Sequence, residues 1–219
     1  MSELLPIFPL GTVVFPGMPL PLHIFEERYR RMLADRVEHD PAFGIVLLRT
    51  GRDNGTEQTL FSVGTAARIV SRRTRRDGRS DIVIEGTRRF DIEDIRWDLG
   101  YGLATIQWRD EMIGNTDHLE ATRDIAIEQF QRYVRGVTKI TGRRFRGIRL
   151  GEDPTSASYD LASRLPLHTW ERQDLLEAES VEARFESLLR IVRREVALLA
   201  KSGTAGLAIN HPGQTFTLN

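Results

Sequence analysis

Hydrophobic and polar positions alternate through the first half of the chain in the manner of short β-strands. Leu20, Leu22 and Ile24 share one face of an extended segment. Extended segments are expected at 18–24, 43–49, 60–63, 66–76, 81–85, 88–95 and 101–108. The Asn-Gly pair at 54–55 and the Asp-Gly pair at 77–78 are typical of tight hairpin turns. So many short strands joined by such turns indicate a barrel or a sandwich rather than a parallel sheet.

Helical spacing of apolar residues occurs once in the first half and dominates the second half. An apolar stripe predicts one helix from about 26 to 38 among the strands. Further helices are expected at 119–137, 156–164, 169–178 and 181–199. Asn115 is a candidate N-cap for the first of these, and Ser180 and Gly203 are candidate caps for the last. Residues 138–153 are punctuated by glycine and predict an irregular loop.

These patterns divide the chain into three parts of different character. Residues 1–114 are predicted to form a β-rich subdomain with one helix, and residues 115–202 a helical bundle. Residues 203–219 are predicted to be a tail that is flexible or strapped onto the body. The expected fold class is therefore α+β, with a barrel that precedes a bundle of helices.

Composition narrows the class of protein without naming a function. The chain has 219 residues, of which 40% are hydrophobic and 28% charged, which excludes wholesale disorder. Cysteine is absent, so a disulfide, a thiol nucleophile and a cysteine metal site are excluded, and a reducing cytoplasm is the expected compartment. No apolar run is long enough to span a bilayer and no signal peptide is visible, so no membrane partner is expected.

Two arginine-rich stretches stand out against a formal net charge of zero. The first surrounds the 77–78 turn, and the second lies within 129–151, which holds no acidic residue. The candidate contacts for nucleic acid or another anion are Arg73, Arg75, Arg76, Arg143, Arg144, Phe145 and Arg146. The alternative is a solvated surface whose arginines pair with acidic residues, which the balanced charge favours.

The familiar catalytic motifs are missing. The sequence contains no phosphate-binding P-loop, no Gly-x-Ser-x-Gly elbow and no His-Glu-x-x-His helix, and no two of its five histidines are four residues apart. His23 lies between a strand and a helix, where it is either a base or, as we prefer, a partner in a structural hydrogen bond. No cofactor or metal is expected. Carboxylates that are distant in sequence can still meet in space, and this stays open.

Several long motifs resemble one known family. They are Leu5-Pro6-Ile7-Phe8-Pro9-Leu10, Val14-Phe15-Pro16-Gly17, the run from Leu20 to Arg30, Phe43-Gly44-Ile45-Val46, Val63-Gly64-Thr65-Ala66 and Gly86-Thr87-Arg88-Arg89-Phe90. Together with the closing helices, they resemble the N-terminal substrate-binding domain of Lon proteases over nearly all of residues 4–200. The tail after Ser202 and the second arginine-rich stretch depart from the pattern.

The resemblance implies a PUA-like β-barrel followed by a helical bundle. In Lon proteases this domain engages unfolded or tagged polypeptides and helps the ring assemble, and a related domain in cereblon is a scaffold for partners. Neither role is catalytic, and this chain ends before an ATPase or a Ser-Lys peptidase could begin. A truncated fragment of a Lon protease is the alternative, but from the ending in a capped helix and a tail we expect a complete standalone protein. Phe8, Phe15, Leu20, Leu22 and Phe25 are expected to fill the barrel, with Tyr29 and Met32 docking the helix on it.

Three functions follow as hypotheses. The first is a non-catalytic module that binds unfolded or tagged polypeptides, or a partner protein, through Pro16, Met18 and Leu20. The second is an RNA-binding protein that uses the arginine-rich hairpin and loop. The third is a small-molecule enzyme, which would require a cleft that joins His23 or His168 to two acids. The physiological partner and the oligomeric state are left open.

Overall fold

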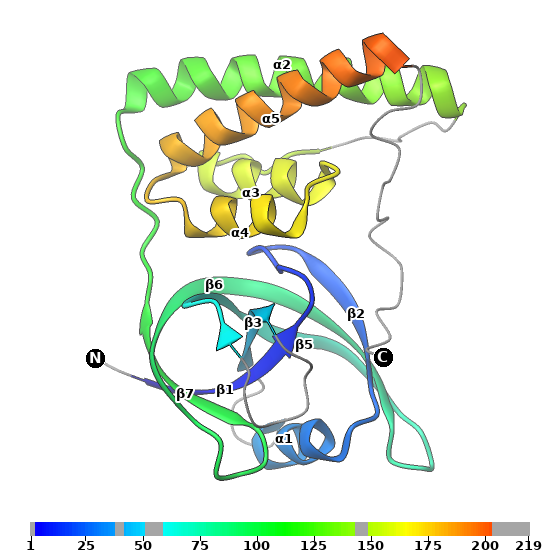
Figure 1. Ribbon diagram of the computed structural model, residues 1–219, viewed down its shortest axis with the longest axis vertical. Coiled ribbons are helices and arrows are strands. Elements are labelled where there is room, and N and C mark those ends of the chain that lie inside the picture. Colours follow the sequence, from blue (N-terminus) through cyan, green and yellow to red (C-terminus); the bar gives the residue numbers. More distant parts are fainter. Residues whose placement is uncertain (1–2, 38–41, 51–58, 143–148, 203–219) are drawn as a thin grey trace. The chain divides into compact units, whose positions relative to one another are not determined.

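The structure is a computed structural model that describes residues 3–37, 42–50, 59–142 and 149–202 (Figure 1). It divides into two compact units. The described part of the first unit ends at Asp110, and the second unit begins at Glu111. The Asn-Gly turn at 54–55, the cap Gly203 and the tail lie outside the described residues.

The first unit is a seven-stranded sheet with one helix. Its elements are β1 (Glu3–Leu10), β2 (Pro19–Ile24), α1 (Glu27–Val37), β3 (Ala42–Thr50), β4 (Thr59–Leu60), β5 (Val63–Thr74), β6 (Ser80–Arg96) and β7 (Gly102–Trp108). Neighbouring strands follow the order β1-β7-β6-β5-β3, and a parallel pairing of β1 with β3 returns to the start. The sheet therefore closes into the expected barrel, with β2 added along β6 and β4 along β3.

Two apolar clusters fill this unit. Phe90 lies in the smaller cluster, where a side chain at Gly44 or Gly64 would meet its ring at 2.6 Å. The larger cluster takes in Leu20, Leu22 and the α1 residues Tyr29, Met32 and Leu33. Phe8 and Phe15 are buried as expected, but Phe25 is 37% exposed and does not fill the barrel. The prediction for Phe25 was wrong because this residue lies in the short connection between β2 and α1.

Strand β6 is continuous where the sequence pattern predicted two separate strands. Its first part, from Ser80 to Glu85, pairs with β2, and its second part, from Phe90 to Arg96, pairs with β7. Gly86 lies between them within the strand. Its carbonyl accepts a hydrogen bond from the Gly17 amide at 2.8 Å, and its amide donates to the Met18 carbonyl at 3.1 Å. The glycine is thus a place where another segment of backbone approaches closely, which a pattern of apolar residues does not reveal.

The second unit is a bundle of helices. Its described helices are α2 (Thr116–Thr141), α3 (Pro154–Arg164), α4 (Thr169–Glu177) and α5 (Val181–Ser202). Helices α2 and α5 run side by side in the same direction: the Asn115 amide donates to Glu182 near their starts, and Leu199 packs on Gly136 near their ends. Asn115 and Ser180 cap the two helices as predicted, at 3.0 Å each.

The predicted loop at 138–153 begins later than expected. Helix α2 continues to Thr141, and the left-handed Gly142 ends it by donating its amide to the Thr138 carbonyl at 2.9 Å. Gly136 lies within the helix, as the predicted range 119–137 implies, and packs against Leu199. A glycine that allows two helices to approach looks the same in sequence as one that ends a helix.

The segment from Glu111 to Ile113 is tied to the second unit. The Met112 and Ile113 carbonyls accept hydrogen bonds from the amides of Val181 and Glu182 at 2.8 and 3.1 Å. The Glu111 carboxylate pairs with Arg184. The division between the two units therefore comes after Asp110, whereas the expected β-rich part extended to residue 114.

Candidate functional site

The outer edge of β2 lacks two of the backbone N–H groups that a strand edge usually presents. Among the described strands, β2 pairs with β6 alone. The Met18 carbonyl accepts a hydrogen bond from the Gly86 amide. In an antiparallel pair of strands, the backbone N–H and C=O groups of every second residue point toward the neighbouring strand, so those of Met18, Leu20 and Leu22 face β6. The backbones of Pro19 and Pro21 then face the opposite edge, where proline has no N–H to offer. This edge is poorly suited to the addition of another strand.

The outward face of the same sheet is apolar between two charged borders. Pro19 is exposed, and Pro21 and its cross-strand neighbour Val83 are half-buried. On one side, Arg68 and Glu85 form an ion pair at 2.9 Å. On the other side, Asp81 accepts from His23 at 2.6 Å and pairs with Arg75 at 2.9 Å. The face therefore offers a small apolar surface with fixed charges at its margins.

The three residues predicted to contact polypeptides are not equally accessible. Leu20 is 2% exposed and belongs to the core, so it cannot reach a partner in this conformation. Pro16 and Met18 are half-buried, and Met18 also packs against the core. The alternation that turns Leu20 inward turns Pro19 and Pro21 outward. The signal for these two prolines was therefore present in the strand pattern, although the predicted contact residues did not include them.

His23 makes a structural hydrogen bond at the end of β2. Its Nδ1 atom lies 2.6 Å from Asp81 on the neighbouring strand. The bond from His23, followed by the bond from Arg75, holds the pKa of the Asp81 carboxyl below its usual value. His168 begins α4, and its ring stacks on Trp170. Neither histidine shows the two-acid cleft that the enzyme hypothesis requires among the described residues.

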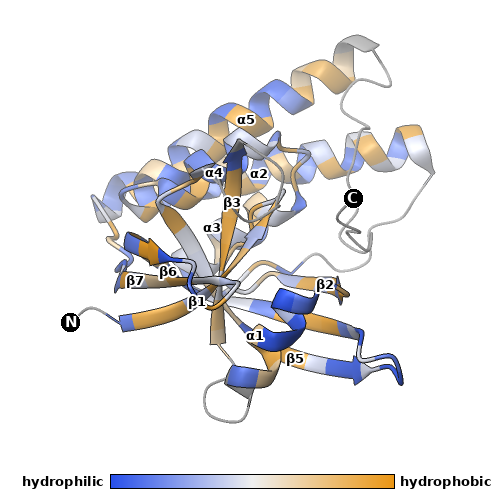
Figure 2. Ribbon diagram, turned by 60° about the horizontal axis from the view of Figure 1, so that its bottom comes forward, coloured by the Kyte–Doolittle hydropathy of each residue, from blue (hydrophilic) through white to orange (hydrophobic). Residues whose placement is uncertain are grey.

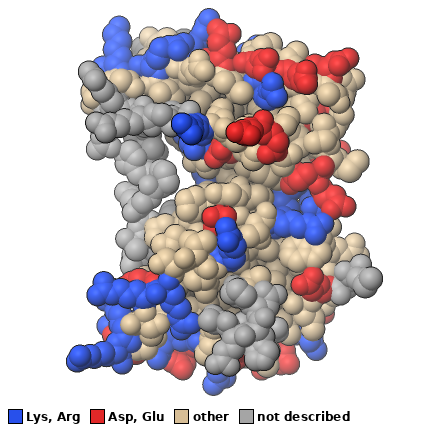
Figure 3. Space-filling model, turned by 180° about the vertical axis from the view of Figure 1, so that it is seen from behind, with Lys and Arg blue, Asp and Glu red and all other residues tan. Residues whose placement is uncertain are grey.

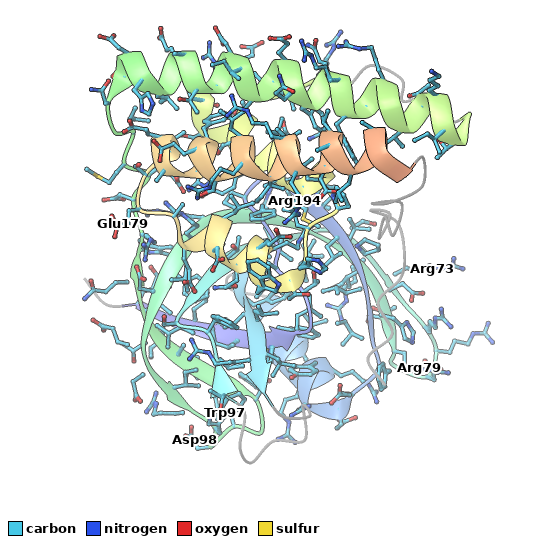
Figure 4. The ribbon with its side chains drawn as sticks, turned by 45° about the horizontal axis from the view of Figure 1, so that its top comes forward. Arg73, Arg79, Trp97, Asp98, Glu179 and Arg194 are labelled. Atoms are coloured by element: carbon cyan, nitrogen blue, oxygen red, sulfur yellow. The ribbon has the colours of Figure 1, made fainter. Side chains whose placement is uncertain are left out.

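The β5–β6 hairpin carries the first arginine-rich stretch (Figure 2). Arg75 and Arg79 pair with Asp81 and Asp77, and the bonds from Arg79 lower the pKa of Asp77. Arg73 and Arg76 are exposed, and within the described ranges no carboxylate lies at salt-bridge distance from them. Basic side chains gather over this hairpin (Figure 3), and Arg73 and Arg79 extend away from the barrel (Figure 4).

The other basic candidates cannot be placed on this surface. Arg143, Arg144, Phe145 and Arg146 all lie outside the described residues. From the first unit, Arg30 of α1 donates to the Gly78 carbonyl at 3.1 Å, which adds a further arginine at the hairpin turn.

None of the described helices is long and apolar enough to cross a membrane.

The fold is that of known Lon N-terminal domains. The crystal structure of the Lon N-terminal domain protein from Xanthomonas campestris is similar, with a TM-score of 0.63 and 25% identity over 86% of this chain and 98% of that one. The N-terminal domain of the Mycobacterium avium complex Lon protease gives a TM-score of 0.61 over 87% and 98% of the two chains. Its identity of 16% supports the fold alone.

The family model of the ATP-dependent protease La (LON) substrate-binding domain matches residues 4–194, so the chain belongs to this family. It is 29% identical over 200 residues to the Lon protease of Azospirillum brasilense, and 27% identical over 197 residues to that of Escherichia coli strain K12. These alignments include 90% and 89% of this chain and 25% of each relative. The chain thus spans about a quarter of the length of the curated relatives it matches.

Proposed function

We propose that this chain recognises unfolded or tagged polypeptides without acting on them chemically. The match of the substrate-binding family model to residues 4–194 is the observation that carries this proposal. The absence of cysteine fits a reducing compartment, and we place this activity in the cytoplasm. ATP hydrolysis and peptide cleavage are activities of whole Lon proteases, and we do not assign them to this chain.

The proposed contact surface is the outward face of β2 and β6, formed by Pro19, Pro21 and Val83, together with the half-buried Pro16 and Met18 in the segment just before β2. Partly exposed apolar side chains can bury against the apolar residues that an unfolded chain exposes. The two prolines remove donors from the edge of β2, so the contacts would come from side chains rather than from strand addition. Contacts of this kind place few demands on the sequence of the bound polypeptide.

The test is a titration of the full chain against a fluorescently labelled, permanently unfolded polypeptide, followed by anisotropy. We expect saturable binding that Met18→Gln and Pro21→Ser each weaken about fivefold, as for contact residues worth roughly 1 kcal/mol. The matched control is Leu99→Gln, because Leu99 is also an exposed apolar residue but lies in the β6–β7 turn. Absence of binding, or equal losses in all three variants, would contradict the proposal.

The exposed hairpin arginines favour one second candidate, RNA binding. Arg73 and Arg76 have no carboxylate partner in the described part of the chain, and planar guanidinium groups match phosphate oxygens. Binding of a single-stranded RNA should weaken steeply with salt. The double variant Arg73→Ala/Arg76→Ala should reduce the slope of log affinity against log salt by about 1.4, at roughly 0.7 for each lost phosphate contact.

The two candidates can be separated in one experiment. Unlabelled RNA is added to the complex of the chain with labelled polypeptide. Persistence of the complex supports a polypeptide site on the β2–β6 face that is separate from the hairpin. Displacement of the polypeptide by RNA would instead assign the polypeptide to the hairpin, provided that the displacement disappears in Arg73→Ala/Arg76→Ala. The control is a chain in which the exposed Arg190 and Arg193 of α5 are changed to Ala, where the displacement should persist.

A further inference from the structure

We propose that His118, Glu182 and Glu186 form a binding site for a divalent transition-metal ion such as Zn²⁺. The three side chains come from the starts of α2 and α5 in the second unit, and their ligand atoms all lie within 4.8 Å of one another. Glu182 and Glu186 are one turn apart on α5, so they share a face of the helix. His118 reaches this face from α2.

The distances suit a metal centre. His118 Nδ1 lies 2.7 Å from Glu182 Oε1 and 3.7 Å from Glu186 Oε1. Ligands of a tetrahedral zinc ion with bonds of about 2.0 Å are about 3.3 Å apart, which lies between these two values. Small side-chain rotations therefore bring the three atoms to a common ion, and a water molecule completes the coordination.

The Glu182 carboxylate is held in place before any ion binds. Its Oε2 atom accepts a hydrogen bond from the Asn115 amide at 2.7 Å, which leaves Oε1 directed at His118. The bond from Asn115, followed by the bond from His118, keeps the pKa of Glu182 below its usual value. Gly114 packs closely on the same carboxylate, where a Cβ atom would lie 2.3 Å from Oε2. Fixed orientation of a ligand by a neighbouring donor is typical of metal sites.

The net negative charge of the cluster favours the binding of a cation. Across the described ranges, neither Glu182 nor Glu186 has an arginine or lysine within salt-bridge distance; their ion pairs are with His118. A neutral imidazole and two carboxylates give a net charge of −2 and one nitrogen and two oxygen donors. Imidazole with carboxylates is a donor set that zinc, cobalt and nickel accept, whereas calcium and magnesium prefer oxygen alone.

The simpler alternative is a hydrogen bond between His118 and Glu182 that needs no metal. Under that alternative, Glu186 contributes only a long ion pair, because its carboxylate is 3.7 Å from His118 and almost half exposed. A metal requires all three ligands. Glu186 is therefore the residue that distinguishes the two interpretations, and its exposure makes a substitution there harmless to the fold.

The test is a titration of the tag-free full chain with Co²⁺, followed by visible absorption, and then displacement by Zn²⁺. We expect one Co²⁺ per chain with a spectrum of low coordination number. Glu186→Gln and His118→Ala should each weaken binding at least about tenfold, as removal of groups around a metal site does. Glu120→Gln is the matched control, because Glu120 is an exposed carboxylate in the same turn of α2.

A thermal melt of the same variants provides a second measurement. At the same Zn²⁺ concentration, the midpoint of the wild-type and Glu120→Gln chains should rise by more than that of Glu186→Gln. Binding that survives Glu186→Gln and His118→Ala would place the ion elsewhere and overturn the proposal. Absence of saturable binding to the wild-type chain would overturn it equally.

Discussion

The guanidinium of Arg184 lies 3.0 Å from the carboxylate of Glu111 and joins the segment that enters the helical unit to its last helix. Arg184 is fully buried, and it also donates to the Leu175 carbonyl and the Ser158 hydroxyl at 3.1 and 3.0 Å. The ring of Tyr159 lies 4.0 Å beneath it. One side chain of α5 thus connects α3, the end of α4 and the entering segment.

The first prediction concerns this connection. Arg184→Met should lower the free energy of unfolding by about 3 kcal/mol or more, because it leaves buried acceptors without their donor. Urea denaturation followed by circular dichroism measures the effect. Arg190→Ala, an exposed change on the same helix, should stay within about 0.5 kcal/mol of the wild type. Equal stability of the two variants would show that the hydrogen bonds and the ion pair of Arg184 contribute little to the free energy of unfolding.

The second prediction concerns the close approach at Gly86. A Cβ atom at this position would lie 2.3 Å from the Phe15 carbonyl oxygen, and backbone cannot yield as a flexible side chain does. Gly86→Ala should therefore lower the free energy of unfolding, measured by urea denaturation, by about 1–3 kcal/mol, as overpacking does. Gly11→Ala is the matched control, since nothing lies within 4 Å of the added atom. A Gly86→Ala chain as stable as this control would mean that the loop before β2 can move aside.

The sequence predicted the order of elements well because the relevant signal is local. Alternation around Leu20 and Leu22 identified β2, and helical spacing with the Ser180 cap identified α5. The pattern divided β6 near Gly86, and it gave no reason for the glycine at 136 within α2. In both cases the reason for glycine is a neighbour distant in the sequence, and no local pattern contains that information.

The candidate site was predictable only in part. The hairpin arginines follow directly from composition and the Asp-Gly turn, and Arg73 and Arg76 lie on the exposed hairpin as that turn implies. Leu20 was predicted both to fill the barrel and to contact polypeptides, and its burial, which follows from the alternation of its own strand, agrees with the first role alone. The His118 cluster could not be foreseen, because Glu182 is 64 residues away in the chain. Such a cluster depends on how two helices pack and not on residue spacing.

The third prediction concerns acid stability in the helical unit. Glu171 is buried, and burial alone would raise its pKa, but bonds from the Arg194 side chain and the His168 amide outweigh this and lower it. A lowered folded-state pKa gives stability that is present above the usual glutamate value of 4.5 and is lost as the pH falls through the folded value.

Glu171→Gln removes that contribution. The variant should be less stable than the wild type at neutral pH, and the difference should shrink as the solution is acidified below the usual glutamate range. Urea denaturation at a series of pH values measures both curves. Glu177→Gln is the matched control, because it removes a carboxylate from the end of the same helix and leaves the contact of Glu171 with Arg194 in place. A constant gap between the wild type and Glu171→Gln at all pH values would refute the assigned ionisation.

The last prediction concerns alkaline titration. Tyr133 is buried on α2, and burial, with a smaller contribution from the charge of Glu195, raises its pKa to about 12. The folded protein therefore keeps this proton at pH values where the unfolded chain has lost it, so stability falls as the pH rises from about 10 toward the folded value. The difference in phenolate ultraviolet absorbance between the wild type and Tyr133→Phe should therefore develop only as the pH approaches 12. A difference that is already complete near pH 10 would contradict the raised pKa of Tyr133.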